Sequence, residues 1–262
     1  MKKHILITND DGYEAAGLHA LIEVLKPDYQ VTVVAPSTEK SACAHSLTLT
    51  KPMRFVSVDD DFFKLDDGTP TDCIYLALYS MFELQKPDLI ISGINRGANM
   101  GEDITYSGTA AGAMEGVLQG VQSIAISQVL SGGNQKDVNY ELACITIKRI
   151  VDGVFAKTFP LDEREFLNIN VPNILKDDCK GMKVTYAGYR MYGNDAHLHR
   201  NPRGEEYYWL GLHPLEWRKR EESVGVSDFE AIEEGYVSIT PVQLDLTAYK
   251  RIQGLQEWIN EV

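Results

Sequence analysis

The sequence predicts an α/β protein, a Rossmann-like sandwich built on a parallel sheet, and three observations support this. Short β-branched runs alternate with helical patterns from residue 4 to residue 171. The first run, the first helix and the second run together occupy about 30 residues, the length of a βαβ unit with a right-handed crossover. The chain of 262 residues is long enough for one large domain, or for one core with an elaboration.

The first βαβ unit lies near the N-terminus. Residues 4–8 form a short apolar run of strand type that ends at the strong turn signal Asn9-Asp10-Asp11-Gly12. Apolar residues recur at helical spacing over residues 15–25, and Pro27 closes this helix. Residues 30–36 are β-branched and predict the second strand. The carboxylate pair is therefore expected at the end of the first strand.

Strands and helices continue to alternate through the middle of the chain. Residues 47–65 alternate enough to predict two or three short strands that leave the main sheet. A helical pattern follows over residues 71–82, and residues 87–93 form a strand of buried type. A helix of small residues over 109–121 and a strand over 123–127 complete four parallel strands with helices between them.

The C-terminal part of the chain predicts a protruding β-hairpin and a last helix. A helix from Asn139 to about Phe155 and a strand over 165–171 come first. Aromatic residues then flank a polar tip at residues 193–204, which predicts a long hairpin, and a final helix follows over 247–259. The flanking aromatic residues are Tyr186, Tyr189, Tyr192, Tyr207, Tyr208 and Trp209. Isolated two-stranded ribbons are marginal in water, so such an arm is often an oligomer contact.

These elements divide the chain into two parts. Residues 1–182 are the predicted Rossmann-like core, and residues 183–262 are the predicted hairpin arm with the C-terminal helix. Both parts are expected to belong to one domain. We expect the arm and the last helix to serve oligomerisation.

Composition excludes several classes of function. The 25 Lys and Arg against 38 Asp and Glu give a net charge of −13, so we expect no binding to nucleic-acid polymers. No apolar run reaches the ~18 residues of a membrane span. Asp10 and Asp11 also interrupt the N-terminal run well below the length of a signal sequence. Four scattered cysteines without a C-x-x-C pair favour reduced thiols in the cytoplasm.

Three polar loops follow predicted strands and mark the expected ligand site. They are residues 9–12, 37–46 and 94–97. Ligands of open parallel sheets bind beyond the carboxyl ends of the strands. Two carboxylates about 4 Å apart repel by roughly 4 kcal/mol at an effective dielectric of 20, so Asp10 and Asp11 together favour a cation. Oxygen ligands without paired His or Cys favour magnesium, calcium or manganese over zinc. The alternative is a plain solvated turn.

Other candidate groups carry weaker signals. Ser107-Gly108-Thr109 precedes the small-residue helix and suits an anion, although a plain N-cap is the commoner role for Ser107 or Thr109. The chain has no G-x-G-x-x-G, P-loop or G-x-S-x-G motif at the required places. His45 is expected to be a bystander, and His197 and His199 are expected in a solvated turn. Cys43 and Cys73 are expected to be structural thiols.

Taken together, six segments resemble the SurE family in order and spacing. They are Ile5-Leu6-Ile7-Thr8-Asn9-Asp10-Asp11-Gly12-Tyr13, Val33-Val34-Ala35-Pro36, Ser41 with Ser46-Leu47-Thr48, Gly68-Thr69-Pro70-Thr71-Asp72-Cys73, Pro87-Asp88-Leu89-Ile90-Ile91-Ser92-Gly93-Ile94-Asn95 and Tyr106-Ser107-Gly108-Thr109. The match is dense over about the first half of the chain. It implies a nucleotidase that uses one divalent cation, magnesium or manganese, to hydrolyse nucleoside 5'- and 3'-monophosphates. Some members of the family also trim short polyphosphate.

The resemblance also implies roles for residues. The metal ligands would be Asp10, Asp11, Ser41 and Asn95. The phosphate would face Ser107, Gly108 and Thr109, with Asn9 nearby. The catalytic set would be Asp10, Asp11, Asn95 and Ser107. One departure is Ala42, where the family usually has glycine after the metal-binding serine. If this position needs a positive φ, alanine strains it.

The implied mechanism is attack on phosphorus by a metal-activated water that Asp10 or Asp11 orients. Homodimers or homotetramers through the C-terminal elements are also implied. Two other classes place acidic residues after a first strand. A signalling receiver domain is shorter and needs an aspartate where this chain has Asn95. An aspartyl-phosphate phosphatase needs a D-x-D spacing, whereas Asp10 and Asp11 are adjacent.

Overall fold

The computed structural model describes residues 2–130, 138–157, 159–193, 196–211, 215–219 and 225–262. The strands are β1 His4–Thr8, β2 Gln30–Pro36, β3 Arg54–Asp59, β4 Phe62–Asp66, β5 Leu89–Arg96, β6 Ser123–Gln128, β7 Glu165–Val171, β8 Met182–Val184, β9 Tyr189–Met191, β10 Ala196–Arg200, β11 Glu206–Leu210, β12 Glu216–Arg218 and β13 Val237–Gln243. The α-helices are α1 Ala16–Leu25, α2 Pro70–Ser80, α3 Gly108–Leu118, α4 Glu141–Ala156, α5 Asp228–Glu233 and α6 Tyr249–Glu261, and the 3-10 turns are η1 Gly101–Thr105 and η2 Lys176–Asp178.

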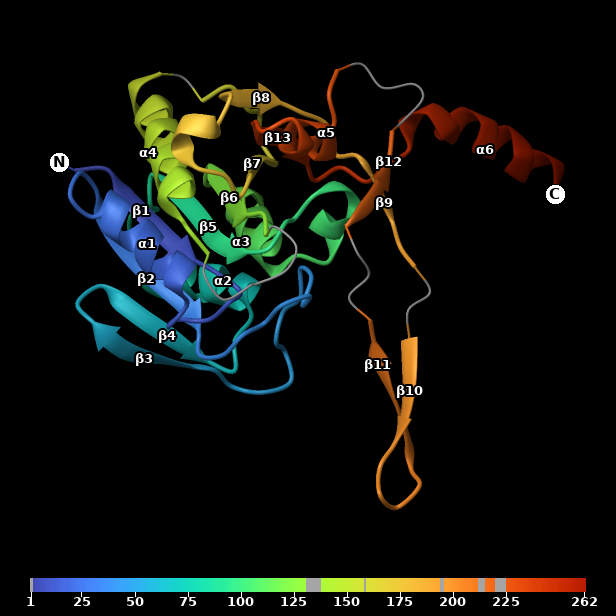
Figure 1. Ribbon diagram of the computed structural model, residues 1–262, viewed down its shortest axis with the longest axis horizontal. Helices are drawn as coiled ribbons and strands as arrows, with labels where there is room; N and C mark the ends of the chain where they lie inside the picture. Colours follow the sequence, from blue (N-terminus) through green and yellow to red (C-terminus); the bar gives the residue numbers. More distant parts are fainter. Residues whose placement is uncertain (1, 131–137, 158, 194–195, 212–214, 220–224) are drawn as a thin grey trace.

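A nine-stranded sheet lies at the centre, in the order β3-β4-β2-β1-β5-β6-β7-β13-β8 (Figure 1). β1 pairs in parallel with both β2 and β5, so that Leu6 lies opposite Thr32 and Ile90. The chain builds outward in one direction through β2 and in the other through β5, β6 and β7. The carboxyl ends of β1 and β5 therefore meet at the switch point of the sheet, where ligands bind in such folds. The predicted Rossmann-like α/β class is confirmed.

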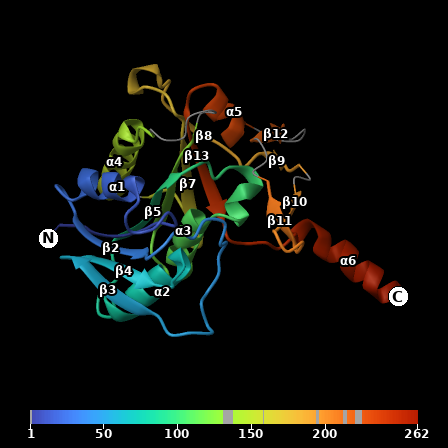
Figure 2. The same cartoon turned by 60° about the horizontal axis from the view of Figure 1, so that its bottom comes forward.

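Helices cover both faces of the sheet (Figures 1 and 2). On one face, α1 and α4 pack through residues such as Leu21 and Ile147 against Ile5 and Ile91. On the other face, α2 packs against a cluster that includes Leu6, and α3 packs against a second cluster. These side chains are almost fully buried, which at about 25 cal/mol per Å² makes the two apolar layers the main stabilisation of the fold.

Local sequence signals set the starts of the two helices that face the site. Thr69 and Asp72 form a capping box at the start of α2, and Pro70 occupies its first turn. Ser107 caps α3, with its Oγ accepting a hydrogen bond from the Ala110 N–H at 2.9 Å. Each cap satisfies backbone donors that the first helical turn leaves free. Both helices begin within two residues of their predicted starts.

The C-terminal segment contributes to the same sheet. β13 pairs antiparallel with β7 and parallel with β8, so residues on both sides of position 182 share one sheet. The sequence analysis did not predict β8, β13 or α5. β13 is hard to predict because it contains Pro241, and a proline inside a β-branched run argues against a strand. It is tolerated here because β8 pairs with β13 only at Val237–Ile239, short of Pro241.

The arm and the last helix stand away from this core. β9 pairs with β12 at the root of the arm, and β10 pairs with β11 in a hairpin that projects from the molecule (Figure 1). The predicted polar tip was too long, because β10 occupies part of it, while Asn194 and Asp195 lie outside the described residues. The solvated turn expected for His197 and His199 is wrong. Both residues are in β10, where His199 stacks on Tyr207 at 5.8 Å.

No helix among the described residues is long and apolar enough to cross a membrane. The longest, α4, has 16 residues and packs one face against the sheet. α6 has 13 residues, all of them exposed.

Candidate active site

The acid pair lies where β1 ends. Asp10 is almost fully buried, and its carboxylate accepts a hydrogen bond from the Thr109 hydroxyl at the start of α3. Its carbonyl oxygen accepts the Lys40 N–H at 2.7 Å, which ties the loop after β2 to the end of β1. Asp11 is less buried and accepts the Arg96 N–H at 2.9 Å from the end of β5. Three segments that are far apart in sequence therefore meet at the two carboxylates.

The electrostatics of the acid pair favour a positive charge beside it. Burial raises the pKa of Asp10 to about 6, the Thr109 hydrogen bond opposes this shift, and the charge of Asp11 adds to it. Burial also raises the pKa of Asp11, with the Arg96 N–H opposing and Glu39 adding to the shift. Both carboxylates are thus poorly stabilised as anions by the protein alone. A cation at this position would restore their ionised form.

Asn95 belongs to the end of β5 rather than to the loop after it, which corrects the predicted boundary. The pairing of β5 with β6 shifts register between Ser92 and Asn95, and Asn95 lies opposite Ser127. Its amide nitrogen donates to the Gly97 carbonyl at 2.9 Å, so the amide oxygen points away from Gly97. Asn95 is 9% exposed, which leaves this side chain close to the surface of the site.

Ser41 lies on the exposed loop after β2. Its hydroxyl donates to Glu39 Oε1 at 2.8 Å and has no described contact with the acid pair. The loop itself is held over the site, because the Ala44 N–H donates to the Tyr106 carbonyl at 3.0 Å. Ala42 has a φ of 56°. The positive φ suspected for this position is therefore present, and Ala42 occupies a conformation that glycine adopts more easily.

The start of α3 lies directly against the acid pair. A Cβ at Gly108 would come within 2.9 Å of Asp10 Oδ2 and 3.0 Å of Cys43 Sγ, so only glycine fits there. Ser107 and Thr109 flank this close approach, and the N–H groups of the first helical turn are suited to an anion. The site thus combines a helix start that is suited to an anion with a pair of acids.

Asn9 lies beneath these groups and is fully buried. Its amide nitrogen donates to the Gly12 carbonyl at 2.8 Å, which holds the turn after β1, and its Oδ1 has no hydrogen-bond partner among the described residues. Buried amide oxygens are normally paired, so Asn9 is a group that a ligand or water can satisfy. The turn itself depends on Gly12, whose φ is 97°.

The donors at this site fit a hard divalent ion. The described residues contain no group of three or more His, Cys, Asp or Glu placed to hold a metal. The available set is two carboxylates, the Asn95 amide oxygen and the Ser41 hydroxyl, all oxygen donors of the kind that magnesium, manganese and calcium prefer. The desolvated Asp10 and the unpaired Asn9 oxygen agree with such a site.

Comparison with known proteins identifies the family. The family model described as Survival protein SurE matches residues 5–194. This chain belongs to the SurE family. Its relatives include the 5'-nucleotidase SurE of Sulfurimonas denitrificans, 62% identical over 99% of this chain and 100% of that protein, and the 5'-nucleotidase SurE of Helicobacter hepaticus, 60% identical over 98% and 99%. The SurE protein from Aquifex aeolicus has a similar structure, with a TM-score of 0.83 and 40% identity over 97% of this chain and 99% of that one.

The structure of this SurE chain also brings residues to the site that the sequence analysis did not select. Glu39 lies near Asp11 and accepts from Ser41, and only its position in the second polar loop could have indicated it. His45, expected to be a bystander in the chemistry, has a structural partner, because its Nε2 lies 2.9 Å from the buried Glu115 carboxylate on α3. This pair fastens the loop after β2 to α3. Its partners are 70 residues apart in sequence, so no local pattern predicts it.

The two thiols near the site are protonated groups. Burial raises the pKa of Cys43 to about 11, and the neighbouring Asp10 charge adds to the shift. Burial also raises the pKa of Cys73 well above its usual value. The thiolate is the nucleophilic form of cysteine, so these residues are poor nucleophiles at neutral pH. The oxygen and amide groups of this SurE site are therefore the stronger candidates for its chemistry.

Proposed function

We propose that this SurE chain is a divalent-metal-dependent nucleotidase that hydrolyses nucleoside 5'- and 3'-monophosphates to nucleoside and phosphate. The chain is a phosphomonoesterase, in keeping with its full-length relatives named 5'-nucleotidase. The observation that supports the reaction most directly is the contact of the buried Asp10 with Gly108 and Thr109. In this contact a buried acid that favours a cation lies beside a helix start that is suited to an anion. A metal-assisted phosphate hydrolysis needs this combination.

In this proposal Asp10, Asp11, Ser41 and Asn95 hold the ion. The ion supplies charge neutralisation for the phosphate and makes a water molecule more acidic. Ser41 has to turn from Glu39 toward the carboxylates, and the exposed position of the loop leaves room for that rotation. Magnesium or manganese suits the four oxygen donors better than zinc.

The remaining site residues bind and orient the substrate. The Ser107 hydroxyl and the N–H groups near Gly108 donate hydrogen bonds to the phosphate oxygens, with Thr109, whose hydroxyl donates to Asp10, and Asn9 lining the same place. Asp10 or Asp11 orients the attacking water in line with the departing nucleoside oxygen. The same arrangement accepts the terminal phosphate of a short polyphosphate, because only the transferred group has to fit the helix start.

The proposal extends to assembly and location. The exposed apolar faces of the hairpin β10–β11 and of α6 favour a homodimer or a homotetramer. The four cysteines are free thiols, as expected of a protein kept in the reducing cytoplasm.

The test is phosphate release from nucleoside 5'- and 3'-monophosphates and from tripolyphosphate, with and without a chelator. We expect chelation to abolish release, and magnesium or manganese to restore it better than zinc. Ribose 5-phosphate serves as a phosphomonoester without a base. No turnover with any metal would overturn the proposal in favour of a nucleotide- or metal-binding protein. A trapped phosphoenzyme would contradict the direct attack of water.

A further inference from the structure

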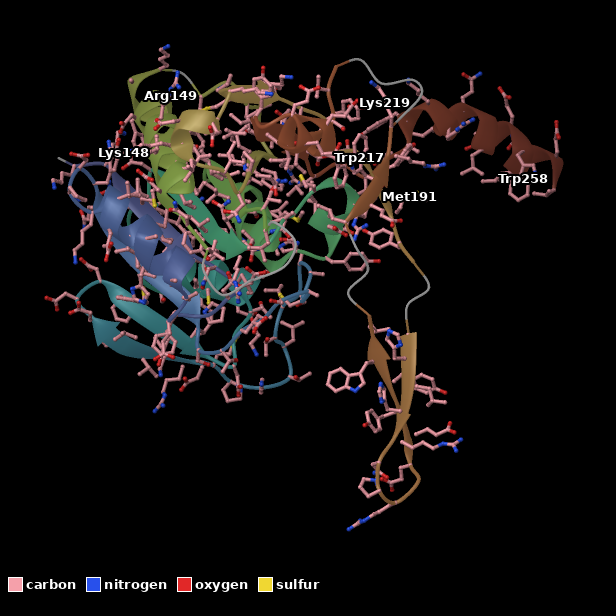
Figure 3. The ribbon with its side chains drawn as sticks, viewed as in Figure 1. Lys148, Arg149, Met191, Trp217, Lys219 and Trp258 are labelled. Carbon is pink, nitrogen blue, oxygen red and sulfur yellow. The ribbon has the colours of Figure 1, made fainter. Side chains whose placement is uncertain are left out.

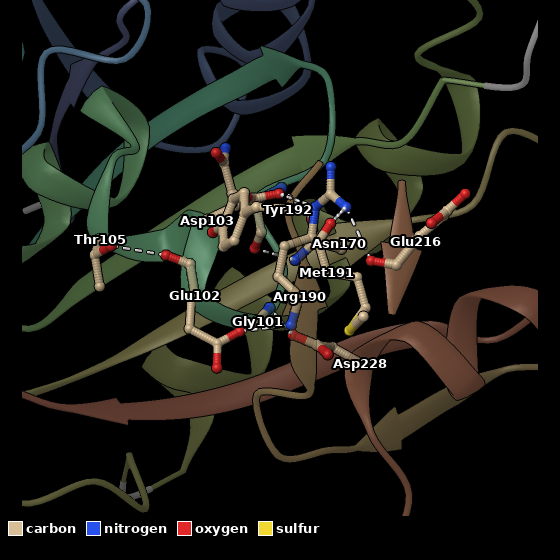
Figure 4. A network of polar contacts seen from close by, with 11 residues as sticks. Gly101, Glu102, Asp103, Thr105, Asn170, Arg190, Met191, Tyr192, Glu216 and Asp228 are labelled. Atoms are coloured by element: carbon tan, nitrogen blue, oxygen red, sulfur yellow. Dashed lines mark hydrogen bonds and ion pairs between the residues drawn. The ribbon is translucent and has the colours of Figure 1, made fainter. Parts of the chain in front are cut away.

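The root of the arm is fastened to the turn that precedes the phosphate-binding helix start. Asp103, in η1, accepts hydrogen bonds from Arg190 Nε at 3.0 Å and from the Tyr192 hydroxyl at 2.8 Å (Figure 4). Glu102 accepts the Arg190 N–H at 2.6 Å. The Arg190 side chain is only 7% exposed and that of Asp103 25%, so this ion pair is partly buried and less screened by water than a surface pair.

A second acid, from the C-terminal part of the chain, holds both the arm root and η1 through hydrogen bonds. Asp228, at the start of α5, is fully buried and accepts the Gly101 N–H at 2.7 Å and the Gly188 N–H at 2.9 Å. Gly101 begins η1, and Gly188 immediately precedes β9. A Cβ at Gly188 would come within 2.6 Å of the Phe229 ring, so the arm root also packs closely on α5. The arm root and η1 are thus held as one unit.

Two tyrosines lie together on the outside of this unit. The rings of Tyr106 and Tyr192 are 6.3 Å apart between centroids and nearly perpendicular, at 82°. Tyr106 is 57% exposed and Tyr192 is 51% exposed, so both residues present apolar ring surface to solvent. The Arg190 guanidinium lies 5.3 Å from the centroid of Tyr192 and stabilises that ring from the core side.

Tyr106 is the residue directly before Ser107, the N-cap of α3, so its backbone adjoins the proposed phosphate position. Its carbonyl also accepts the Ala44 N–H from the loop that carries Ser41, which fixes the Tyr106 backbone between the two halves of the site. A ligand whose phosphate lies at the start of α3 and whose planar ring points toward the arm would contact Tyr106 and Tyr192.

We propose that Tyr106 and Tyr192 form the nucleoside-binding wall of the active site, and that the partly buried Arg190–Asp103 pair positions Tyr192 in that wall. The inference rests on the proposed function, because it assumes that a nucleoside monophosphate binds with its phosphate at α3. Aromatic faces stack on every base. The wall is therefore expected to recognise the presence of a base more than its identity.

The first experiment compares substrates that differ only by the base. kcat/KM is measured for adenosine 5'-monophosphate and for ribose 5-phosphate in the unmodified full-length protein, in Tyr106→Ala and in Tyr192→Ala. We expect the ratio of the two values to fall by about 5- to 150-fold in each variant, mainly through KM, as expected for the loss of ~1–3 kcal/mol of stacking. Tyr79→Ala is the matched control, since Tyr79 is 74% exposed on α2 and lies outside the site.

The outcomes separate this inference from the proposed function. If the unmodified protein hydrolyses no nucleotide, the proposed function fails. If the unmodified protein hydrolyses nucleotides, and kcat/KM falls equally for both substrates in the variants or changes for neither, the nucleoside-binding wall is disproved. A change of sedimentation coefficient with an unchanged substrate ratio would also disprove it, because the rings would then be a contact between protein copies.

The second experiment tests the positioning role of Asp103. Tyr192→Phe keeps the ring and removes its hydroxyl bond, so the substrate ratio should fall less than in Tyr192→Ala. Asp103→Asn weakens the pair with Arg190 and should lower the ratio, whereas a purely structural role would lower activity on both substrates alike. In the Asp103→Asn background, Tyr192→Ala should add little further loss, since coupled residues are non-additive. Full additivity would contradict the positioning role.

Discussion

At the scale of single residues, Ala42 and Ala44 have φ angles of 56° and 54° in the loop after β2. This left-handed conformation is unfavourable for any residue with a Cβ, by about 1–2 kcal/mol. The loop keeps it because hydrogen bonds at both ends, from Lys40 to Asp10 and from Ala44 to Tyr106, fix the path of the chain. The loop thus carries backbone strain directly beside Ser41.

Ala42→Gly should therefore stabilise the protein. Removal of the Cβ relieves the strain, and the greater freedom of glycine in the unfolded chain offsets part of the gain, which leaves about 0.5–1 kcal/mol. The shift is measured as the urea midpoint. Ala156→Gly, at the exposed end of α4, is the control and should lower stability by a similar amount. Equal destabilisation by both changes would show that Ala42 is unstrained.

Asp10, a metal ligand in the proposed function, also carries an energetic penalty. Its folded pKa of about 6 exceeds the usual 3.8, so in the metal-free protein the folded state holds this proton more tightly than the unfolded state. Stability is therefore lost as the pH rises from about 4 through 6, and the full penalty of roughly 3 kcal/mol is present at pH 8. Metal binding would offset this penalty by stabilising the carboxylate.

Asp10→Asn should consequently lose activity and gain stability. We expect turnover to fall by more than about 100-fold, since the neutral amide removes a charged metal ligand. In chelator, the variant should exceed the unmodified protein in unfolding free energy by about 1 kcal/mol at pH 4.5 and about 3 kcal/mol at pH 8. Circular dichroism checks that the fold is intact. Near-normal turnover, or a stability difference that shrinks as the pH rises, would contradict this assignment.

At the scale of elements, α3 reaches its place because its small residues let it approach the sheet. A Cβ at Gly116 would come within 2.2 Å of Ser123 Oγ, and one at Gly112 within 2.8 Å of Ser92 Oγ and Thr8 Cγ2. Ser123 is itself fixed by a hydrogen bond to the Val121 carbonyl. The depth of α3 on the sheet sets the distance between its first turn and Asp10.

Two glycine-to-alanine substitutions should therefore change the free energy of unfolding in opposite directions. Gly116→Ala forces α3 or the sheet to shift and should lower the unfolding free energy by about 1–3 kcal/mol. Gly153→Ala, on α4, has no atom within 4 Å of the new Cβ and should raise it by about 0.5–1 kcal/mol through helix propensity. Urea unfolding curves of the two variants measure this contrast. Stabilisation by both would show that α3 has space that the glycine contacts do not indicate.

At the scale of the whole molecule, α6 and the hairpin expose apolar side chains and have no core of their own. Ile252, Leu255, Trp258 and Ile259 lie on one side of α6, and each is more than half exposed. Trp258 lies near the chain end, clear of the sheet and its helices (Figure 3). Such a face in water favours association, because burial of apolar surface is the main driving force of assembly.

Trp258→Glu should shift the protein toward a lower oligomeric state. A charge on the apolar side of α6 would be desolvated in any contact made there. Gln253→Glu, which adds the same charge to the polar side, should leave assembly unchanged. Sedimentation velocity across protein concentrations measures both variants. Identical sedimentation of both variants and the unmodified protein would show that α6 takes no part in assembly.

The sequence determined most of the core, because its signals are local. The acid pair after β1, the bounds of β2 and β7 and the alternation that predicts helices on both faces all follow from hydrophobic period and turn residues within short windows. The starts of α2 and α3 were likewise predictable from capping residues such as Thr69 and Ser107. Asp10 could be selected because it follows β1, and Asn95 because it lies at the end of β5.

Only the tertiary structure decided how distant segments meet. The contact of Asp10 with Gly108, the pairing of His45 with Glu115 and the junction of Arg190 with Asp103 each join residues at least 70 positions apart. The place of β13 between β7 and β8 is also a long-range pairing. Local periodicity reports which face of an element is buried, but the partner of that face depends on the packing of the whole chain.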